Sequence, residues 1–190
     1  MIDAMEGQEV ATSDIPGAFL QTDYDKGDIH IKLEGAMVTL LEEIDLEYYK
    51  DLIFTDKRGR KCMYAEANKA IYGTLEASLI FWGEISKSLK DMRYQRNEYN
   101  WCFMNKIIDN KQCTILWHVD DTKTSHVGPD VVSRVLADID AEHGNIAKMT
   151  ITRHKVHKYL GMTIDYSLPG KVIFSMIDYI GICLTVFQKT

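Results

Sequence analysis

The stretch from Cys113 to Thr122 constrains the fold of this chain more than any other. Asp120 and Asp121 follow a run of β-branched and bulky apolar residues, a pattern typical of a buried strand. A second short strand-like run follows over 123–127, so we predict a β-hairpin that carries both acids at its tip. Such a tip can hold a divalent metal ion. Aspartate is also a common turn residue, however, and an isolated Asp-Asp pair is a weak motif.

A third carboxylate lies far upstream of this hairpin. Asp14 is followed by a turn signal, Pro16-Gly17, and then by the apolar cluster 18–20. The upstream acid favours a metal site at the hairpin tip over an ordinary turn.

Composition limits the class of protein. The chain has 190 residues, of which 46% are hydrophobic, and this predicts a single domain over residues 1–190 with a substantial core. The net charge of −6 counts against a free-standing nucleic-acid-binding protein, which is usually basic. The four cysteines form no CxxC pair and the N-terminus does not resemble a signal peptide, so we expect reduced thiols in a cytoplasmic or nuclear, not secreted, protein. No apolar run approaches the length of a membrane span, and we expect no membrane partner.

Hydrophobic periodicity predicts two main helices. One runs over 66–92 and is interrupted by Gly73, where a glycine would let another backbone or a ligand approach closely; the other runs over 129–143 and ends at Gly144. The predicted buried stripe of the first helix is Ile71, Leu75, Leu79, Trp82, Ile85 and Leu89, and that of the second is Val131, Val132, Val135, Leu136 and Ile139.

Strands and turns fill the rest of the chain. A half-buried strand is predicted over 28–33, and further strands over 99–108, 157–166 and 172–176. Residues 1–13 are polar and mixed, 36–54 are helical in part, 109–111 form a turn, and the basic turn 57–61 is either a solvated loop or a phosphate contact. This order predicts an α+β fold, with helices packed on one face of an antiparallel sheet.

Four short motifs then occur in a recognisable order. They are Asp14-x-x-x-Ala18-Phe19-Leu20, Tyr72-Gly73 with Ala77-Ser78 and Phe81-Trp82, His118-Val119-Asp120-Asp121, and Tyr159-Leu160-Gly161-Met162. Together they resemble the reverse transcriptase of copia-type retrotransposons, over nearly the whole chain from Asp14 to Leu184. The resemblance implies a polymerase palm with antiparallel sheet and helices, and RNA-directed DNA polymerase activity as part of a longer polyprotein.

The resemblance assigns metal ligands and cofactors. The carboxylates of Asp14, Asp120 and Asp121 would be catalytic and would bind two Mg²⁺ ions, which prefer hard oxygen ligands. We expect Asp14 and Asp120 to face each other on adjacent strands and to share an ion, with Asp121 as the looser partner. Successive strand residues point in opposite directions, so Asp120 and Asp121 cannot be equivalent.

The resemblance also assigns substrate contacts. Phe19 would be the bulky gate beneath the sugar of the incoming deoxynucleoside triphosphate, unless it is simply a core phenylalanine. Tyr72 and Gly73 would lie on the helix under the template and nascent base pair. Leu160 and Gly161 would form the hairpin that holds the primer end. The implied partners are an RNA or DNA template with its primer, and deoxynucleoside triphosphates.

Some positions depart from the family pattern. Leu75 and Glu76 stand where the family has lysine and glutamine, and His118 replaces the usual tyrosine. The sequence predicts the palm with part of the fingers, without a ribonuclease H or integrase domain, and we therefore expect weak binding of primer-template by this chain alone.

Two other functions remain open from the residues. One is a non-catalytic retrotransposon remnant that keeps the fold but lacks polymerase activity. The other is an unrelated metal-dependent phosphohydrolase built on Asp14, Asp120 and His126. The HxxH pair His154 and His157 is expected to be a polar surface pair, because no third zinc ligand follows at a suitable spacing.

Overall fold

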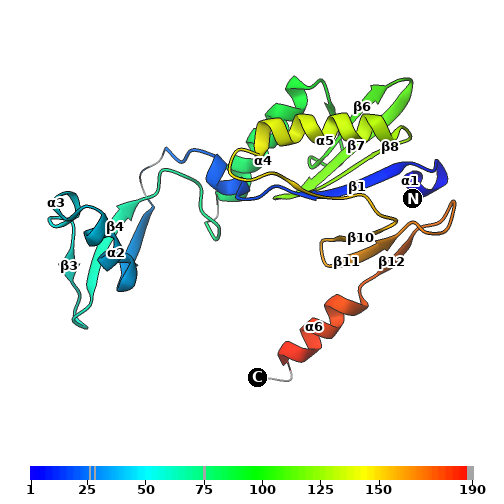
Figure 1. The fold of residues 1–190 in the computed structure, drawn as a ribbon. Helices are drawn as coiled ribbons and strands as arrows, with labels where there is room; N and C mark the ends of the chain where they lie inside the picture. The colour runs from blue at the N-terminus through cyan, green and yellow to red at the C-terminus, as the bar shows by residue number, and fades with distance from the viewer. Residues whose placement is uncertain (26, 28, 75, 188–190) are drawn as a thin grey trace.

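A six-stranded antiparallel sheet forms the centre of the computed structural model, which describes residues 1–25, 27, 29–74 and 76–187 (Figure 1). The strand order is β5-β6-β7-β8-β1-β9. The strands are β1 (Glu9–Asp14), β5 (Gln95–Arg96), β6 (Phe103–Ile108), β7 (Lys111–His118), β8 (Asp121–His126) and β9 (Thr150–Thr152). Two residues used in the sequence predictions, Asp28 and Leu75, lie outside the described ranges.

The predicted hairpin with the acids at its tip is confirmed. Strands β7 and β8 pair in antiparallel register, with His118 opposite Asp121. The apolar side chains of β7 at Cys113, Ile115 and Trp117 are buried in the main core, as a strand with one covered face requires. The turn at Asp109-Asn110, where both residues have positive φ, joins β6 to β7 as predicted.

Strand β1 is the main element that the sequence did not predict. It lies between β8 and β9, although residues 1–13 look polar. The polar side chains are buried with partners: the hydroxyl groups of Ser13 and Thr122 lie 2.5 Å apart, and that of Thr12 lies 3.1 Å from Nδ1 of His157. Cross-strand hydrogen bonding therefore replaces the apolar alternation that sequence patterns detect. A short helix, α1 (Ile2–Met5), precedes this strand.

Two helices cover one face of the large sheet (Figure 1). Helix α5 (Pro129–His143) has the predicted bounds, and all five residues of its predicted stripe are buried. Helix α4 (Ala77–Asp91) is much shorter than predicted, because the described residues before it, 67–74 and 76, form turns and irregular backbone, with Gly73 at φ +93°. Its buried face is Ala77, Phe81, Ile85 and Leu89, at every fourth position, whereas Leu79 is exposed.

A separate three-stranded sheet follows β9. It consists of β10 (Val156–Tyr159), β11 (Met162–Asp165) and β12 (Ile173–Ser175), and leads into α6 (Ile177–Phe187). The single strand predicted over 157–166 is wrong, because the chain reverses at Leu160-Gly161, where φ is +50° and +75°. The strand predicted over 99–108 starts only at Phe103, since residues 97–102 form a loop.

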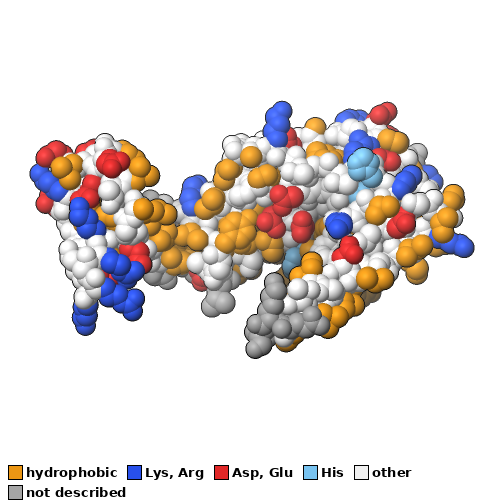
Figure 2. Space-filling view, turned by 60° about the horizontal axis from the view of Figure 1, so that its bottom comes forward, with side chains coloured by type: hydrophobic (Ala, Val, Ile, Leu, Met, Phe, Trp, Pro, Cys, Tyr) orange, Lys and Arg blue, Asp and Glu red, His pale blue; other side chains and the backbone are white. Residues whose placement is uncertain are grey.

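Residues 30–66 form a small unit apart from this body (Figures 1 and 2). It contains β2 (His30–Glu34), β3 (Phe54–Thr55), β4 (Lys61–Glu66), α2 (Ala36–Ile44) and α3 (Leu46–Tyr49). Strand β2 was expected to be half-buried but is largely exposed, because so small a unit buries few side chains, among them Val38, Cys62 and Met63. None of the helices in the described ranges has the length and apolar character needed to cross a bilayer.

Candidate active site

The three aspartates named by the sequence come together at one edge of the large sheet, which we call the acidic edge (Asp14, Asp120 and Asp121). Asp14 ends β1 and pairs in register with Asp121, the first residue of β8. Asp120 lies in the two-residue turn after β7, and its carbonyl accepts a hydrogen bond of 3.0 Å from the N–H of Ile15. This bond fixes the turn against the end of β1. Asp120 is therefore in a turn, and the expectation that it lies on a strand is wrong.

The carboxylates of the acidic edge repel one another. Burial and the charge of Asp120 raise the pKa of Asp14. The pKa of Asp121 is raised by burial, then by the charges of Asp120 and Asp14. Among the described residues, none of the three forms an ion pair with a lysine or arginine. Such a group of anions would be stabilised by a bound cation.

Tyr72 connects the acidic edge to the apolar core. Its hydroxyl donates a hydrogen bond of 2.9 Å to Oδ2 of Asp120. Burial, this hydrogen bond and the neighbouring acids raise the pKa of Tyr72 to about 12, so the hydroxyl remains a donor at neutral pH. The sequence motif named Tyr72 but did not predict this bond, because no short spacing in the sequence relates positions 72 and 120.

Phe19 packs against the ring of Tyr72. The two ring centroids are 4.3 Å apart, and Phe81 of α4 lies 6.2 Å from Phe19. Phe19 is only 6% exposed and belongs to the main core. It is thus a core side chain that also supports Tyr72, the hydrogen-bond donor to Asp120, and its role as a sugar gate stays a prediction.

Gly73 lies outside helix α4, contrary to the sequence prediction. Its φ of +93° is a conformation that glycine adopts without strain, and it places a turn directly after Tyr72. No heavy atom lies within 4 Å of the position that a Cβ would take. Close approach of another part of the described chain therefore does not explain this glycine, whereas the turn does.

The Leu160-Gly161 turn lies on the same side as the acidic edge. The hydroxyl of Tyr159, the residue before the turn, is buried without a hydrogen-bond partner among the described residues. Burial raises the pKa of Tyr159, as do the charges of Asp121 and Cys102, so the tyrosine lies near both. A Cβ added at Gly161 would lie 3.0 Å from the ring of Tyr179, so α6 packs closely against the turn.

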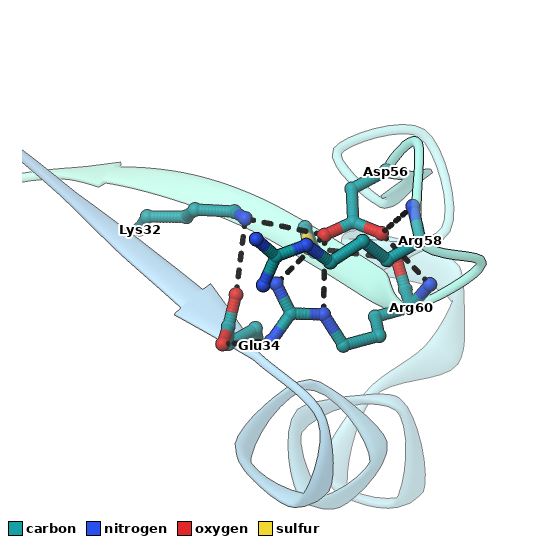
Figure 3. A network of polar contacts seen from close by, with 6 residues as sticks. Lys32, Glu34, Asp56, Arg58 and Arg60 are labelled. Carbon is teal, nitrogen blue, oxygen red and sulfur yellow. Dashed lines mark hydrogen bonds and ion pairs between the residues drawn. The ribbon is translucent and has the colours of Figure 1, made fainter.

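A second acidic group lies in the small unit and has a different character (Figure 3). Possible ligand atoms of Glu34, Asp56 and Cys62 lie within 4.8 Å of one another. Lys32 and Arg60 already form ion pairs with both carboxylates. This group is therefore neutralised by protein cations and does not require a metal ion.

The acidic edge offers the type of ligand atom that magnesium prefers. It offers carboxylate oxygens, and these lack a protein cation within the described chain. The three carboxylates are not gathered within 4.8 Å of one another, unlike the ligand atoms of the small unit. Asp14, Asp120 and Asp121 would therefore have to move closer together to hold one ion in common.

Two of the four basic residues of the turn 57–61 in the small unit are engaged in ion pairs. Arg60 binds Asp56 and Glu34, and Lys61 binds Glu42. These two cations are consequently not free for a phosphate contact.

Glu76, one of the positions that depart from the family pattern, accepts a 3.4 Å hydrogen bond from the hydroxyl of Tyr24.

His126 does not contribute to the acidic edge, whereas His118 lies opposite Asp121. His126 lies at the opposite end of β8 from Asp121, is buried, and contacts the backbone of Ile108 and Gly128. A phosphohydrolase site built on Asp14, Asp120 and His126 is therefore wrong. His157 is buried rather than on the surface, so the expected surface pair with His154 is wrong as well.

Comparison with known proteins finds only distant structural similarity. No protein-family model matches the sequence, and no curated protein does. The structure of apo telomerase from Candida tropicalis is similar at a TM-score of 0.46 and 12% identity, over 87% of this chain and 32% of that one. Telomerase from Candida albicans, in complex with a TWJ fragment of telomeric RNA, is similar at 0.42 and 12%, over 83% and 30%. The chain spans about a third of the telomerase chains, and these scores are too low to establish a common fold.

Proposed function

We propose that this chain is the palm region, with part of the fingers, of a copia-type reverse transcriptase, and that it transfers nucleotides with two magnesium ions. The observation that carries the proposal is the acidic edge. Three aspartates from distant parts of the sequence meet where β1 ends and β7 turns into β8. The same residues occupy the acid positions of the motifs that resemble this family.

The residues of the acidic edge have distinct roles in this proposal. When bound, two magnesium ions would activate the primer 3′-hydroxyl and stabilise the leaving pyrophosphate. Asp120 would be the central ligand, because its turn is hydrogen-bonded to the end of β1 and its charge raises the pKa of both Asp14 and Asp121. The hydrogen bond from Tyr72 orients the Asp120 carboxylate. A primer annealed to an RNA or DNA template and a deoxynucleoside triphosphate would be the substrates.

In this proposal, the floor of the substrate site is the pair of contacting rings at Phe19 and Tyr72, whose planes are tilted at 43°. If Phe19 is the sugar gate, Phe19→Ala admits ribonucleotides, because the clash with the 2′-hydroxyl is removed. The measurement is the ratio of ribonucleotide to deoxynucleotide use in primer extension. An unchanged ratio would assign Phe19 to the core alone.

Primer extension with Asp120→Asn tests the function as a whole. Losing a metal ligand removes several kcal/mol of transition-state stabilisation, so extension should fall at least about a hundredfold. Asp51→Asn is the matched control, because it removes the same charge from an exposed position in the small unit. Equal activity in the wild type, Asp120→Asn and Asp51→Asn would contradict the proposal.

The alternative is a folded remnant without polymerase activity. It is favoured by the separation of the three carboxylates and by the net charge of −6, which weakens binding to phosphates. This alternative predicts that the wild type shows neither template-dependent extension nor magnesium binding that depends on Asp120. Calorimetric titration with Mg²⁺, for the wild type and Asp120→Asn, separates the two cases.

A further inference from the structure

The loop over 97–102, between β5 and β6, is fixed by its own hydrogen bonds. The side-chain oxygen of Asn97 accepts from the N–H groups of Tyr99 at 2.9 Å and Asn100 at 3.1 Å. The side-chain oxygen of Asn100 in turn accepts from the N–H of Cys102 at 2.9 Å. A loop ordered in this way loses little conformational entropy when a ligand binds to it.

This loop presents aromatic rings to solvent. Trp101 is 60% exposed and Tyr99 is 96% exposed. The ring of Trp101 stacks on that of Trp82 from α4, with centroids 6.0 Å apart and planes at 30°. The guanidinium carbon of Arg96 lies 4.8 Å from the Trp101 ring centroid. We call this series, Arg96, Trp101 and Trp82, the aromatic ladder.

Two arginines that are unpaired within the described chain lie on or just before edge strand β5, and one of them, Arg96, contacts the Trp101 ring. Arg96, on edge strand β5, and Arg93, just before it, form no ion pair with any residue in the described ranges. Both cations are therefore available to a phosphate group, in a chain whose net charge is −6. Glu98 opposes them in the same loop.

The ladder lies at the end of the sheet that carries the acidic edge. The carbonyl of Cys102 accepts a hydrogen bond of 3.0 Å from the N–H of Trp117, close to the end of β7. Phe103, the first residue of β6 after this loop, pairs with Leu116 of β7, and His118 at the end of β7 pairs with Asp121 of the acidic edge. A nucleic-acid strand that passes the acidic edge can therefore continue onto the loop 97–102.

We propose that the aromatic ladder binds unpaired bases of a nucleic-acid single strand. Exposed aromatic rings with arginine beside them suit bases and phosphates, and base stacking tolerates any sequence. A protein partner would also use Trp, Tyr and Arg, but the two unpaired arginines favour a polyanion. The biological role of this site rests on the proposed polymerase function, whereas binding itself does not require catalysis.

Fluorescence anisotropy of a labelled oligothymidylate of about 12 nucleotides tests the site. Trp101→Ala should weaken binding by about tenfold or more, and Trp101→Phe should keep most of it, because the phenyl ring still stacks. Tyr48→Ala is the matched control, because Tyr48 is a similarly exposed aromatic residue of the small unit. Removing the opposing charge with Glu98→Gln should tighten binding. Circular dichroism confirms that each variant is folded.

Further outcomes separate the possible interpretations. An oligomer of the same length with abasic sugars should bind the wild type and Trp101→Ala equally, because it cannot stack. Trp101→Ala should lower the oligothymidylate affinity by the same factor in the Asp120→Asn background as in the wild type, so that failure of catalysis and failure of this site are distinguishable. Unchanged affinity in Trp101→Ala would overturn the proposal. So would loss of self-association in that variant, measured by light scattering, without any loss of oligonucleotide affinity.

Discussion

The acidic edge of the large sheet and the acidic group of the small unit contain the same kind of side chain under opposite conditions. In the small unit, Asp56 accepts hydrogen bonds from the backbone N–H groups of Arg60 and Arg58 and from the Arg60 guanidinium, and its pKa is lowered. At the acidic edge, the pKa values of Asp14 and Asp121 are raised.

This difference distinguishes structural acids from candidate functional ones. Acids that are paired with protein cations contribute to the fold and leave nothing for a ligand to neutralise. Acids that are held together without protein cations cost stability, and that cost is recovered when cations bind. The acidic edge is held in this unfavourable state by the apolar core beneath it, whereas the small unit has little core and relies on surface ion pairs.

The largest expected effect is a core substitution in the body. Ile115 is fully buried on β7, directly beneath both helices. Ile115→Ala should lower the free energy of unfolding by about 2–5 kcal/mol, because it leaves a cavity that the helices cannot fill. Chemical denaturation measures this loss. Ile107→Ala, at an exposed position on neighbouring strand β6, should change it little.

A smaller loss is expected from the buried ion pair of the body. Asp3 accepts hydrogen bonds from Lys123 at 2.7 Å, Ser125 at 2.9 Å and Tyr166 at 3.2 Å. Asp3→Asn should cost about 2 kcal/mol, because Lys123 is then left buried without its counter-ion. Lys123→Met in the Asp3→Asn background should recover part of the stability. A double variant less stable than Asp3→Asn would show that the pair is not what holds α1 to the sheet.

Parts of both the body and the small unit could be predicted from the sequence. In the small unit, the strand expected over 28–33 corresponds to β2, and the partly helical stretch expected over 36–54 contains α2 and α3. The hairpin at Asp120 and helix α5 have strong periodic patterns and turn signals, and both were predicted with nearly correct bounds. Strand β1 was missed because Thr12 and Ser13 are buried through hydrogen bonds made by residues far away in sequence. Helix α4 was predicted too long because its apolar pattern continues back into the segment 67–74, whose backbone forms turns rather than helix.

Prediction from the sequence has the same limit for the candidate site as for the fold. The sequence named Asp14, Asp120 and Asp121, because short motifs identify them. The sequence did not reveal the hydrogen bond from Tyr72 to Asp120 or the aromatic ladder, because both join residues that only the tertiary structure brings together. Contacts of this kind have no local pattern.

A modest effect is expected from the ion pairs of the small unit. Arg60→Met removes the cation shared by Asp56 and Glu34, and should lower the melting temperature by about 2–4 °C at low salt. The difference from the wild type should shrink in about 1 M NaCl, because exposed ion pairs are screened. A loss that is independent of salt would indicate that Arg60 acts through packing of its aliphatic stem.

The smallest change in stability is expected at the acidic edge, where the substitution should stabilise the protein instead of destabilising it. Because the folded-state pKa of Asp121 is raised above 3.8, ionising this carboxyl costs more in the folded protein than in the unfolded chain. This cost is absent below pH 3.8, where both states are protonated, and it grows as the pH rises through the folded-state pKa. Asp121→Asn should therefore raise the melting temperature by about 1–2 °C at pH 7 without metal, and the gain should vanish near pH 3.

With Mg²⁺ present, the wild type should have the higher melting temperature, because it gains stability from the bound ion and Asp121→Asn gains less. Asp51→Asn, which removes an exposed charge, should follow the wild type under both conditions. Two results together would contradict this prediction: a wild-type melting temperature that does not respond to Mg²⁺, and an Asp121→Asn variant no more stable than the wild type at pH 7. The aspartates of the acidic edge would then be structural acids, like those of the small unit.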